Sequence, residues 1–162
     1  MSLFAHPEYR WRETYCVFFK ESQRPQATDV QAAFSRLGDR YQLKEIHGDE
    51  DGNLDSLTMI SPPDFAAMDI SFVSGEEVQE QQDELLAEID SMAMDEDEKQ
   101  KLKKLKTCDA RYDIYHFEQL VDFYADDDEE EFLDPAALLI VLDWFAALCG
   151  GVGIDPQANT IM

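Results

Sequence analysis

The sequence predicts an α+β domain in which an antiparallel sheet carries helices on one face. Residues 67–73 alternate strictly: positions 68, 70 and 72 carry large apolar side chains, and the positions between them carry a mixed set that includes Asp and Ser. This two-residue period is typical of a half-buried strand. Residues 135–149 are apolar nearly all round, as expected for a helix at the centre of a fold. The segments follow in the order strand, helix, several strands, helix pair, strand, helix. We therefore predict a ferredoxin-like βαββαβ core with an added C-terminal apolar helix.

The first half of the chain supplies one helix and three strands. Residues 11–20 predict a buried strand, because β-forming side chains occupy both alternating faces. Thr28, with Gln31 three residues later, predicts the N-cap of a helix that stops near Gly38. The next two predicted strands, at residues 41–47 and 54–61, are joined by a hairpin rich in Gly and Asp at residues 48–53.

The second half begins with a helix over residues 76–92, which has a narrow apolar stripe and an acidic first turn. Asp95 and Glu98 predict the cap of a shorter helix. Because only two leucines anchor that helix, we predict a mobile helical excursion over residues 93–107. Residues 120–124 are ambiguous between strand and helix. The remaining predicted elements are a strand at 111–117, an acidic loop at 125–132, the apolar helix at 135–149 and a short edge strand at 152–154.

Length and composition favour a single domain, residues 1–162, with a substantial core: the chain has 162 residues, of which 44% are apolar. The first residues lack the basic and apolar pattern of a secretory signal, and the longest apolar stretch is interrupted by Asp143, so we expect no membrane association. The three cysteines show neither disulfide nor zinc spacing. We predict that Cys16, Cys108 and Cys149 are reduced and buried, in a cytoplasmic protein.

Charge is distributed unevenly along the chain, whose formal net charge is −23. Residues 49–98 carry seventeen acidic side chains and no Lys or Arg, and residues 99–106 then carry five lysines. A polyanion would be repelled, so direct binding of nucleic acid is not expected. A basic protein or a cation would be attracted, although the same acidity could serve only solubility or adaptation to salt.

This distribution predicts an acidic surface for a basic partner. Its candidate residues are Asp49, Asp51, Asp55, Glu76, Glu77, Glu80, Asp83, Glu84 and Glu88. Two alternatives stay open: a small carboxylate- or metal-dependent enzyme that uses Asp51, Asp69 or Asp143, and an inhibitor that mimics nucleic acid and needs carboxylates spaced along a ridge.

Residues 47–55 can be aligned with a calcium-binding loop through Gly52. The first ligand position then holds His47 and the closing position holds Thr58, so both anchoring carboxylates are missing. A tight hairpin explains the same Asp and Gly residues better. The acidic run 126–131 is interpreted as a solvated loop. We predict no metal and no cofactor.

No catalytic residue is predicted either, and the interpretation leans away from an enzyme. A Cys–His nucleophile pair has no local signature here. His116 is predicted to be a core histidine with its hydrogen bonds satisfied, and Asp143 to face solvent rather than to act as a buried acid. The glycines at 150–153 follow a helix, which is the wrong context for phosphate binding.

Aromatic side chains are numerous, and beside acidic residues they could form a surface for Arg and Lys. We favour their completing the core. The residues concerned are Tyr9, Trp11, Tyr15, Phe117, Phe123, Tyr124, Phe132 and Trp144.

Residues 138–154, followed by Asp155, Pro156 and Gln157, resemble the ending of several small acidic bacterial families. In these families an apolar helix runs into a Gly-Gly turn, a short strand and an Asp-Pro pair. Some members are similar to immunity proteins that neutralise toxins, and others are uncharacterised domains. The resemblance implies a small bacterial cytoplasmic protein without catalytic residues, and it supplies no site residue.

Overall fold

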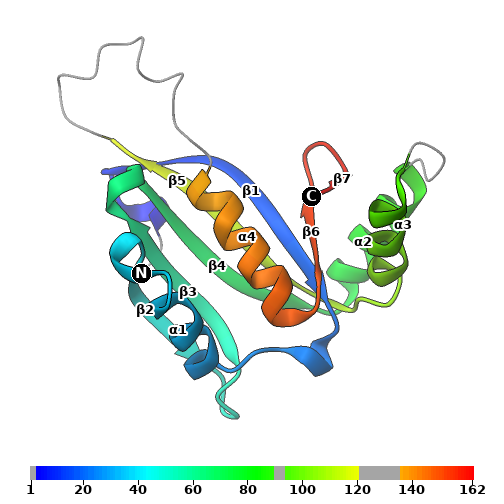
Figure 1. Ribbon diagram of the computed structural model, residues 1–162, viewed down its shortest axis with the longest axis horizontal. Helices are drawn as coiled ribbons and strands as arrows, with labels where there is room; N and C mark the ends of the chain where they lie inside the picture. The colour runs from blue at the N-terminus through cyan, green and yellow to red at the C-terminus, as the bar shows by residue number, and fades with distance from the viewer. Residues whose placement is uncertain (1–2, 90–93, 121–135) are drawn as a thin grey trace, which may run out of the picture.

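A computed structural model describes residues 3–89, 94–120 and 136–162 (Figure 1). Its centre is one seven-stranded sheet, in the order β2-β3-β4-β5-β1-β6-β7, and neighbouring strands are antiparallel throughout. The strands are β1 (Tyr9–Phe19), β2 (Gln42–Gly48), β3 (Leu54–Ser61), β4 (Ala66–Ser74), β5 (Ala110–Gln119), β6 (Val152–Asp155) and β7 (Thr160–Ile161).

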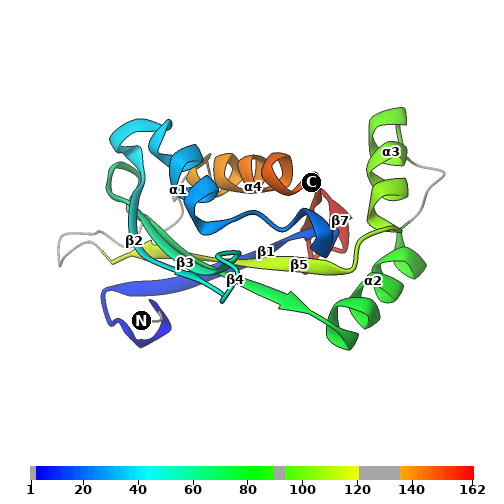
Figure 2. The same ribbon diagram turned by 90° about the horizontal axis from the view of Figure 1, so that it is seen from below.

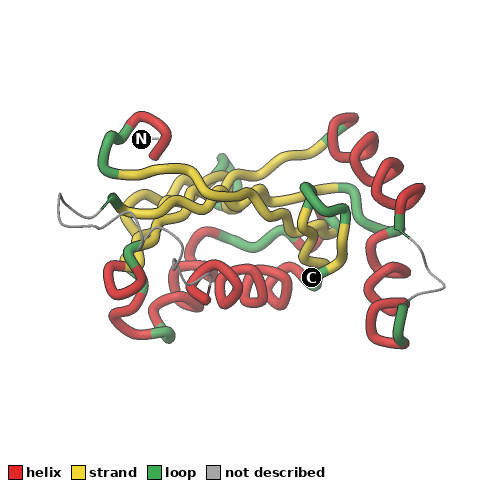
Figure 3. The backbone as a smooth tube through the Cα atoms, turned by 90° about the horizontal axis from the view of Figure 1, so that it is seen from above, coloured by secondary structure: helices red, strands yellow, loops and turns green. Residues whose placement is uncertain are grey.

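The described helices are α1 (Ala27–Ser35), α2 (Glu76–Glu88), α3 (Glu96–Leu105) and α4 (Ala136–Cys149). Four short 3-10 turns accompany them: η1 (Leu3–Ala5), η2 (Glu21–Gln23), η3 (Gly38–Arg40) and η4 (Pro62–Asp64). Helices α1 and α4 lie on one face of the sheet, which we call the first face, whereas α2 and α3 lie at one end of it (Figures 2 and 3).

The predicted α+β class with an antiparallel sheet is therefore confirmed. The ferredoxin-like order is not confirmed, because the sheet has seven strands and β1 lies between β5 and β6. The placement of helices on one face holds for α1 and α4 only. Helix α2 packs beside the opposite face, since its Val78 and Leu85 join Cys16 and Phe18 of β1 in an apolar cluster.

The main core lies between the first face and the helices that cover it. Val17 and Phe19 of β1 point into it, as does Tyr112 of β5, whose ring stacks on that of Phe19 with centroids 5.0 Å apart. Phe145 of α4 meets the Tyr112 ring edge-on at 5.4 Å. The Tyr112 hydroxyl donates to the Leu54 carbonyl at 2.8 Å, so the buried phenol is satisfied. These contacts fasten α4 to the middle of the sheet.

The opposite, second face is covered by described residues mainly at its two ends. At one end Leu3 of η1 packs with Ala67 and Phe117. At the other end lies the cluster formed by α2, α3 and β1. Between these ends the burial alternates over residues 56–59 of β3 and 68–71 of β4, with first-face side chains buried and second-face ones half-buried.

The predicted start of the first helix is wrong by two residues. Helix α1 begins at Ala27, and Gln26 rather than Thr28 occupies the N-cap, without a side-chain hydrogen bond. The reason is a contact distant in sequence: the Ala27 amide donates to the Gly52 carbonyl at 2.9 Å, and Gln26 forms a β-bridge with Asn53. The β2–β3 hairpin thus fixes where the helix starts.

Helix α3 begins as predicted, since the Asp95 carboxylate accepts from the Glu98 amide at 2.8 Å. Its C-terminal end is held by Gln82 of α2, whose side-chain amide donates to the carbonyls of Leu105 at 2.6 Å and Cys108 at 2.8 Å. The mobility of residues 93–107 stays a prediction. The acidic loop at 125–132 and most of the ambiguous stretch 120–124 lie outside the described residues.

Candidate functional site

The acidic residues of α2 form the clearest charged surface of the described chain. Val78, Gln82 and Leu85 take the buried positions of the helix, and all six carboxylates are exposed. The exposed acids of this helix are Glu76, Glu77, Glu80, Asp83, Glu84 and Glu88. No Lys or Arg occurs between residues 76 and 88, so the exposed side of α2 carries one sign of charge.

Half of these carboxylates have neighbours. The Glu77 carboxylate lies 3.3 Å from Arg111, Asp83 accepts from Gln79 at 3.4 Å, and Glu88 accepts from Asn159 of the β6–β7 turn. Glu76, Glu80 and Glu84 have neither a hydrogen bond nor an ion pair with any part of the chain that the structure describes. Because they are spaced four residues apart, their like charges lie next to one another along the helix. Each such pair destabilises a helix by about 0.2–0.5 kcal/mol.

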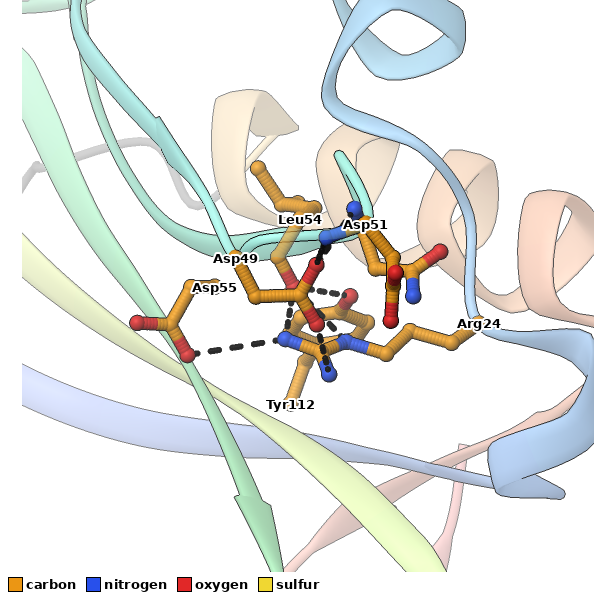
Figure 4. A network of polar contacts seen from close by, with 7 residues as sticks. Arg24, Asp49, Asp51, Leu54, Asp55 and Tyr112 are labelled. Carbon is orange, nitrogen blue, oxygen red and sulfur yellow. Dashed lines mark hydrogen bonds and ion pairs between the residues drawn. The ribbon is translucent and has the colours of Figure 1, made fainter.

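The hairpin between β2 and β3 carries the other three predicted residues, Asp49, Asp51 and Asp55. Here the carboxylates have a positively charged neighbour, the side chain of Arg24 (Figure 4). Arg24, from the loop before α1, donates to Asp49 at 3.1 Å and lies 3.5 Å from Asp55. Its guanidinium also donates to the Leu54 carbonyl at 2.9 and 3.1 Å and lies 3.7 Å from the Phe72 ring centroid. The hairpin's negative charge is therefore partly neutralised.

The Asp49 carboxylate also closes the turn itself. One of its oxygens accepts from the amides of Asp51 and Asn53, both at 2.9 Å. Burial would raise the pKa of Asp49, but these hydrogen bonds and the Arg24 charge outweigh that effect and lower it. The hairpin interpretation is confirmed. No group of three or more His, Cys, Asp or Glu side chains within the described ranges is arranged to hold a metal ion.

The structure thus places the nine predicted residues in two separate places. Figures 1 and 2 show the hairpin and α2 apart from each other. Arg24 was not predicted, because it lies 25 residues before Asp49 and no local pattern pairs the two. Both groups present exposed carboxylates without an ion pair among the described residues, and α2 presents more of them: Glu76, Glu80 and Glu84, against Asp51 in the hairpin.

A buried ion pair fastens α2 to the sheet. Arg111 and Asp113, neighbours on the second face of β5, are 7% and 6% exposed. The guanidinium donates to the two Asp113 oxygens at 2.8 and 3.3 Å, and its remaining donors reach Gln81 and Glu77 of α2. The Cys16 thiol donates to the same Asp113 carboxylate at 3.3 Å. This network holds the first turns of the acidic helix in a fixed orientation to the sheet.

All three cysteines are buried and unpaired, as predicted. Burial raises the pKa of Cys108 to about 11 and that of Cys149 to about 12. The pKa of Cys16 is raised further, first by burial and then by the Asp113 charge. Because the thiolate is the reactive form, these environments oppose nucleophilic chemistry at any of the three.

We expect the folded protein to react slowly with a thiol reagent such as DTNB at pH 8, since raised pKa values keep all three side chains in the unreactive thiol form. Addition of denaturant should release three fast-reacting thiols, and this unfolded sample is the control. Cys108, whose pKa is raised least of the three, should be the first to react in the folded state. Rapid labelling of Cys16 without unfolding would contradict the assignment.

Asp143 is exposed on α4, as predicted, and His116 is fully buried. The expectation that His116 is satisfied is wrong within the described residues: neither ring nitrogen has a hydrogen-bond partner there, although a Glu13 carboxylate oxygen lies 3.4 Å from Nδ1. Asp69 accepts from the Leu3 amide at 2.8 Å and from Thr58 at 2.6 Å on the second face. Asp69 and Asp143 therefore belong to opposite sides of the sheet.

The aromatic residues divide between core and surface. Phe117 is buried, whereas Trp11 is 41% exposed and donates to the Thr14 hydroxyl at 3.0 Å. Tyr9, Tyr15 and Trp144 are half-buried. Completion of the core is thus the main but not the only role of this set, and Phe123, Tyr124 and Phe132 lie outside the described residues.

Comparison of the chain with protein-family models, with curated proteins and with solved structures gives no match. The resemblance of residues 138–154 to small acidic bacterial families accordingly stays a prediction. Among the helices in residues 3–89, 94–120 and 136–162, none combines the length and the apolar character needed to span a bilayer.

Proposed function

We propose that this protein is a non-catalytic binding or regulatory domain that engages a basic protein through the acidic surface of α2. The observation that carries the proposal is the exposure of six carboxylates on a helix without a single Lys or Arg. Three of them, Glu76, Glu80 and Glu84, have no partner among the described residues. Such a one-signed surface attracts a basic protein at long range and speeds its association.

The arrangement also costs stability, which supports a role in binding. Repeated acids at i and i+4 repel one another along α2, so an isolated helix of this sequence gains nothing from them. Arg111 contacts Gln81 and Glu77 of the helix, and Gln82 donates from its buried side to Leu105 at the end of α3. These contacts hold the helix in place without engaging Glu76, Glu80 or Glu84. The buried, unpaired cysteines support placing the protein in a reducing compartment, and we propose the cytoplasm. Toxin neutralisation, as in immunity proteins, is one activity of this class.

An inhibitor that mimics nucleic acid is the second candidate. It is favoured by the alignment of the acids along one helix, which extends for about 20 Å at 1.5 Å per residue. The two candidates differ in the partner: a mimic would be displaced from its partner by DNA or RNA, whereas a general basic partner would not.

The test is affinity purification from lysate with identification of retained proteins by mass spectrometry. We expect a basic protein to be retained at low salt and released near 0.5 M salt, where screening acts within a few Å. The triple variant Glu76→Gln, Glu80→Gln, Glu84→Gln should lose that same protein. The matched control removes three exposed charges elsewhere, by Glu8→Gln, Asp39→Asn and Glu50→Gln, and should retain it. The proposal fails when the wild type and the α2 variant retain the same proteins.

A further inference from the structure

Strand β2 forms the long outer edge of the sheet. Of the two outermost strands, β7 has only two residues, whereas β2 has seven and pairs with β3 alone (Figure 1). In the part of the chain that the structure describes, no strand lies on the other side of β2. An edge strand presents backbone N–H and C=O groups that can pair with a further strand. The edge of β2 is therefore a candidate surface for association.

A β-bulge determines which side chains of β2 share a face. Leu43 is opposite Met59 of β3 and Ile46 is opposite Leu57, and the register shifts between them because Lys44 is an extra residue. Met59 and Leu57 are buried on the first face. Leu43 and Ile46 consequently both pack at the border of the main core, although residues three apart in a regular strand point to opposite faces.

This pattern is self-complementary about a two-fold axis perpendicular to the sheet. Such an axis makes two copies of β2 antiparallel, and paired strands place side chains of the same face opposite each other. With the axis between Lys44 and Glu45, Leu43 is opposite Ile46 of the second copy, and Lys44 is opposite Glu45 of the second copy. The symmetry repeats each pair, so apolar pairs form on the first face and pairs of opposite charge form beside the bulge.

The charges of the edge favour this partner over an unrelated strand. A lysine at a sheet edge ordinarily discourages pairing, because an added strand leaves it without a counter-ion. Lys44 is exposed and has neither an ion pair nor a hydrogen bond with any described residue. Glu45 has contacts within its own chain, including His47 at 3.8 Å, but a carboxylate can accept about four hydrogen bonds and so can also receive Lys44 of the second copy.

The surroundings of β2 lack the negative charge of the rest of the chain. Residues 36–47 carry three Lys or Arg and two acidic side chains, in a chain whose net charge is −23. Two copies repel each other at long range, but the Debye length is about 8 Å at about 0.15 M salt, so the facing surfaces then dominate. Helix α1 lies over β2 and β3 on the first face, so joined edges would also bring two α1 helices together (Figures 1 and 2).

We propose that a second copy of this chain pairs with the β2 edge and forms a two-fold dimer with a continuous sheet. Lys44 and Glu45 select this partner and this register, because a strand of different sequence leaves one or both of them without a counter-ion. The edge is apart from α2, so the dimer leaves the acidic helix exposed (Figure 1). The inference thus goes beyond the proposed function and does not depend on it.

Sedimentation velocity over a range of protein concentrations measures the dimer. Small interfaces are weak, so we expect a dissociation constant of roughly 10–100 µM. The dimer should strengthen as salt rises from about 0.02 to about 0.5 M, because screening removes the repulsion between the chains, whereas binding of a basic protein by α2 should weaken. Amide hydrogen exchange in residues 42–47 should slow at high protein concentration.

Charge reversal tests the register. Lys44→Glu should weaken the dimer about tenfold or more, since it places like charges opposite each other at both symmetric positions, and Glu45→Lys should do the same. An equimolar mixture of the two variants should form a heterodimer, because their edges carry opposite charges. Lys103→Glu, at an exposed position of α3, makes the same change in net charge as Lys44→Glu and is its matched control. It should dimerise as the wild type does.

The outcomes separate this inference from the proposed function. A protein that stays monomeric at every concentration and salt would overturn the edge dimer and leave the acidic helix as a binding surface. A dimer that survives both reversals at residues 44 and 45, or that the triple α2 variant abolishes, would assign association to another surface and overturn the inference. Loss of the dimer in each single variant, with its return in the mixture, would establish it. The proteins that the α2 variant retains from lysate test the proposed function alone.

Discussion

Replacing Arg111 with Met is expected to lower the free energy of unfolding by about 3–5 kcal/mol, because it leaves the Asp113 carboxylate buried without its counter-ion. Asp113 is 6% exposed, and apart from Arg111 only the Cys16 thiol donates to it among the side chains described. The same substitution removes the donors to Gln81 and Glu77 that hold α2 to β5. Urea unfolding followed by circular dichroism measures the loss.

The double variant Arg111→Met, Asp113→Leu is the control for this prediction. It removes both charges together and fills the space with apolar atoms, a change that is often neutral or even stabilising in buried pairs. We therefore expect the double variant to be more stable than Arg111→Met alone. A double variant that is as unstable as the single one would show that packing, rather than the unpaired carboxylate, sets the cost.

Replacing Phe145 with Ala is expected to cost about 3–5 kcal/mol, the range for deleting a buried aromatic ring. The Phe145 ring is fully buried, and it contacts the rings of Tyr112 on the sheet and Phe34 on α1, with centroids 5.4 and 5.5 Å away. Its removal opens a cavity where both first-face helices meet the sheet. Chemical unfolding at 25 °C is the measurement.

Leu139→Ala is the matched control for Phe145→Ala, since it removes apolar atoms from the same helix at a position that is 37% exposed. It should cost well under half as much. Comparable losses in the two variants would mean that α4 does not use the Phe145 side to pack on the sheet, and the assigned orientation of the helix would be wrong.

Local patterns predicted most of the strands and helices. The predicted strand 54–61 has the same bounds as β3. The alternating stretch 67–73 covers β4 except for one residue at each end. These signals are local, because burial of alternating side chains leaves a trace in the neighbouring residues themselves. Strand β7 was missed, since two residues are too few for a period to show.

The order of the strands could not be predicted in the same way. It depends on pairings between segments far apart in the chain, and the register of β1 with β5 includes an irregularity between Trp11 and Glu13. The start of α1 failed for a related reason: the bridge from Gln26 to Asn53 overrides the capping preference of Thr28.

The candidate site was predicted in part. The acidic character of α2 is a property of consecutive residues, so the sequence displayed it directly. The neutralisation of Asp49 by Arg24, and the attachment of α2 to β5 through Arg111, both require the fold.

The interior position of β1, between β5 and β6, has a consequence for how the chain folds. Strands β2, β3 and β4 are consecutive and need only short loops to pair, whereas β1 pairs with segments near the other end of the chain, as the separation of 97 residues between Cys16 and Asp113 shows. Closing such long loops slows folding, so we expect the three-stranded meander to form early and β1 to be inserted late. Until then residues 17–19 are an apolar strand with two unpaired edges, and we expect this segment to promote aggregation during refolding.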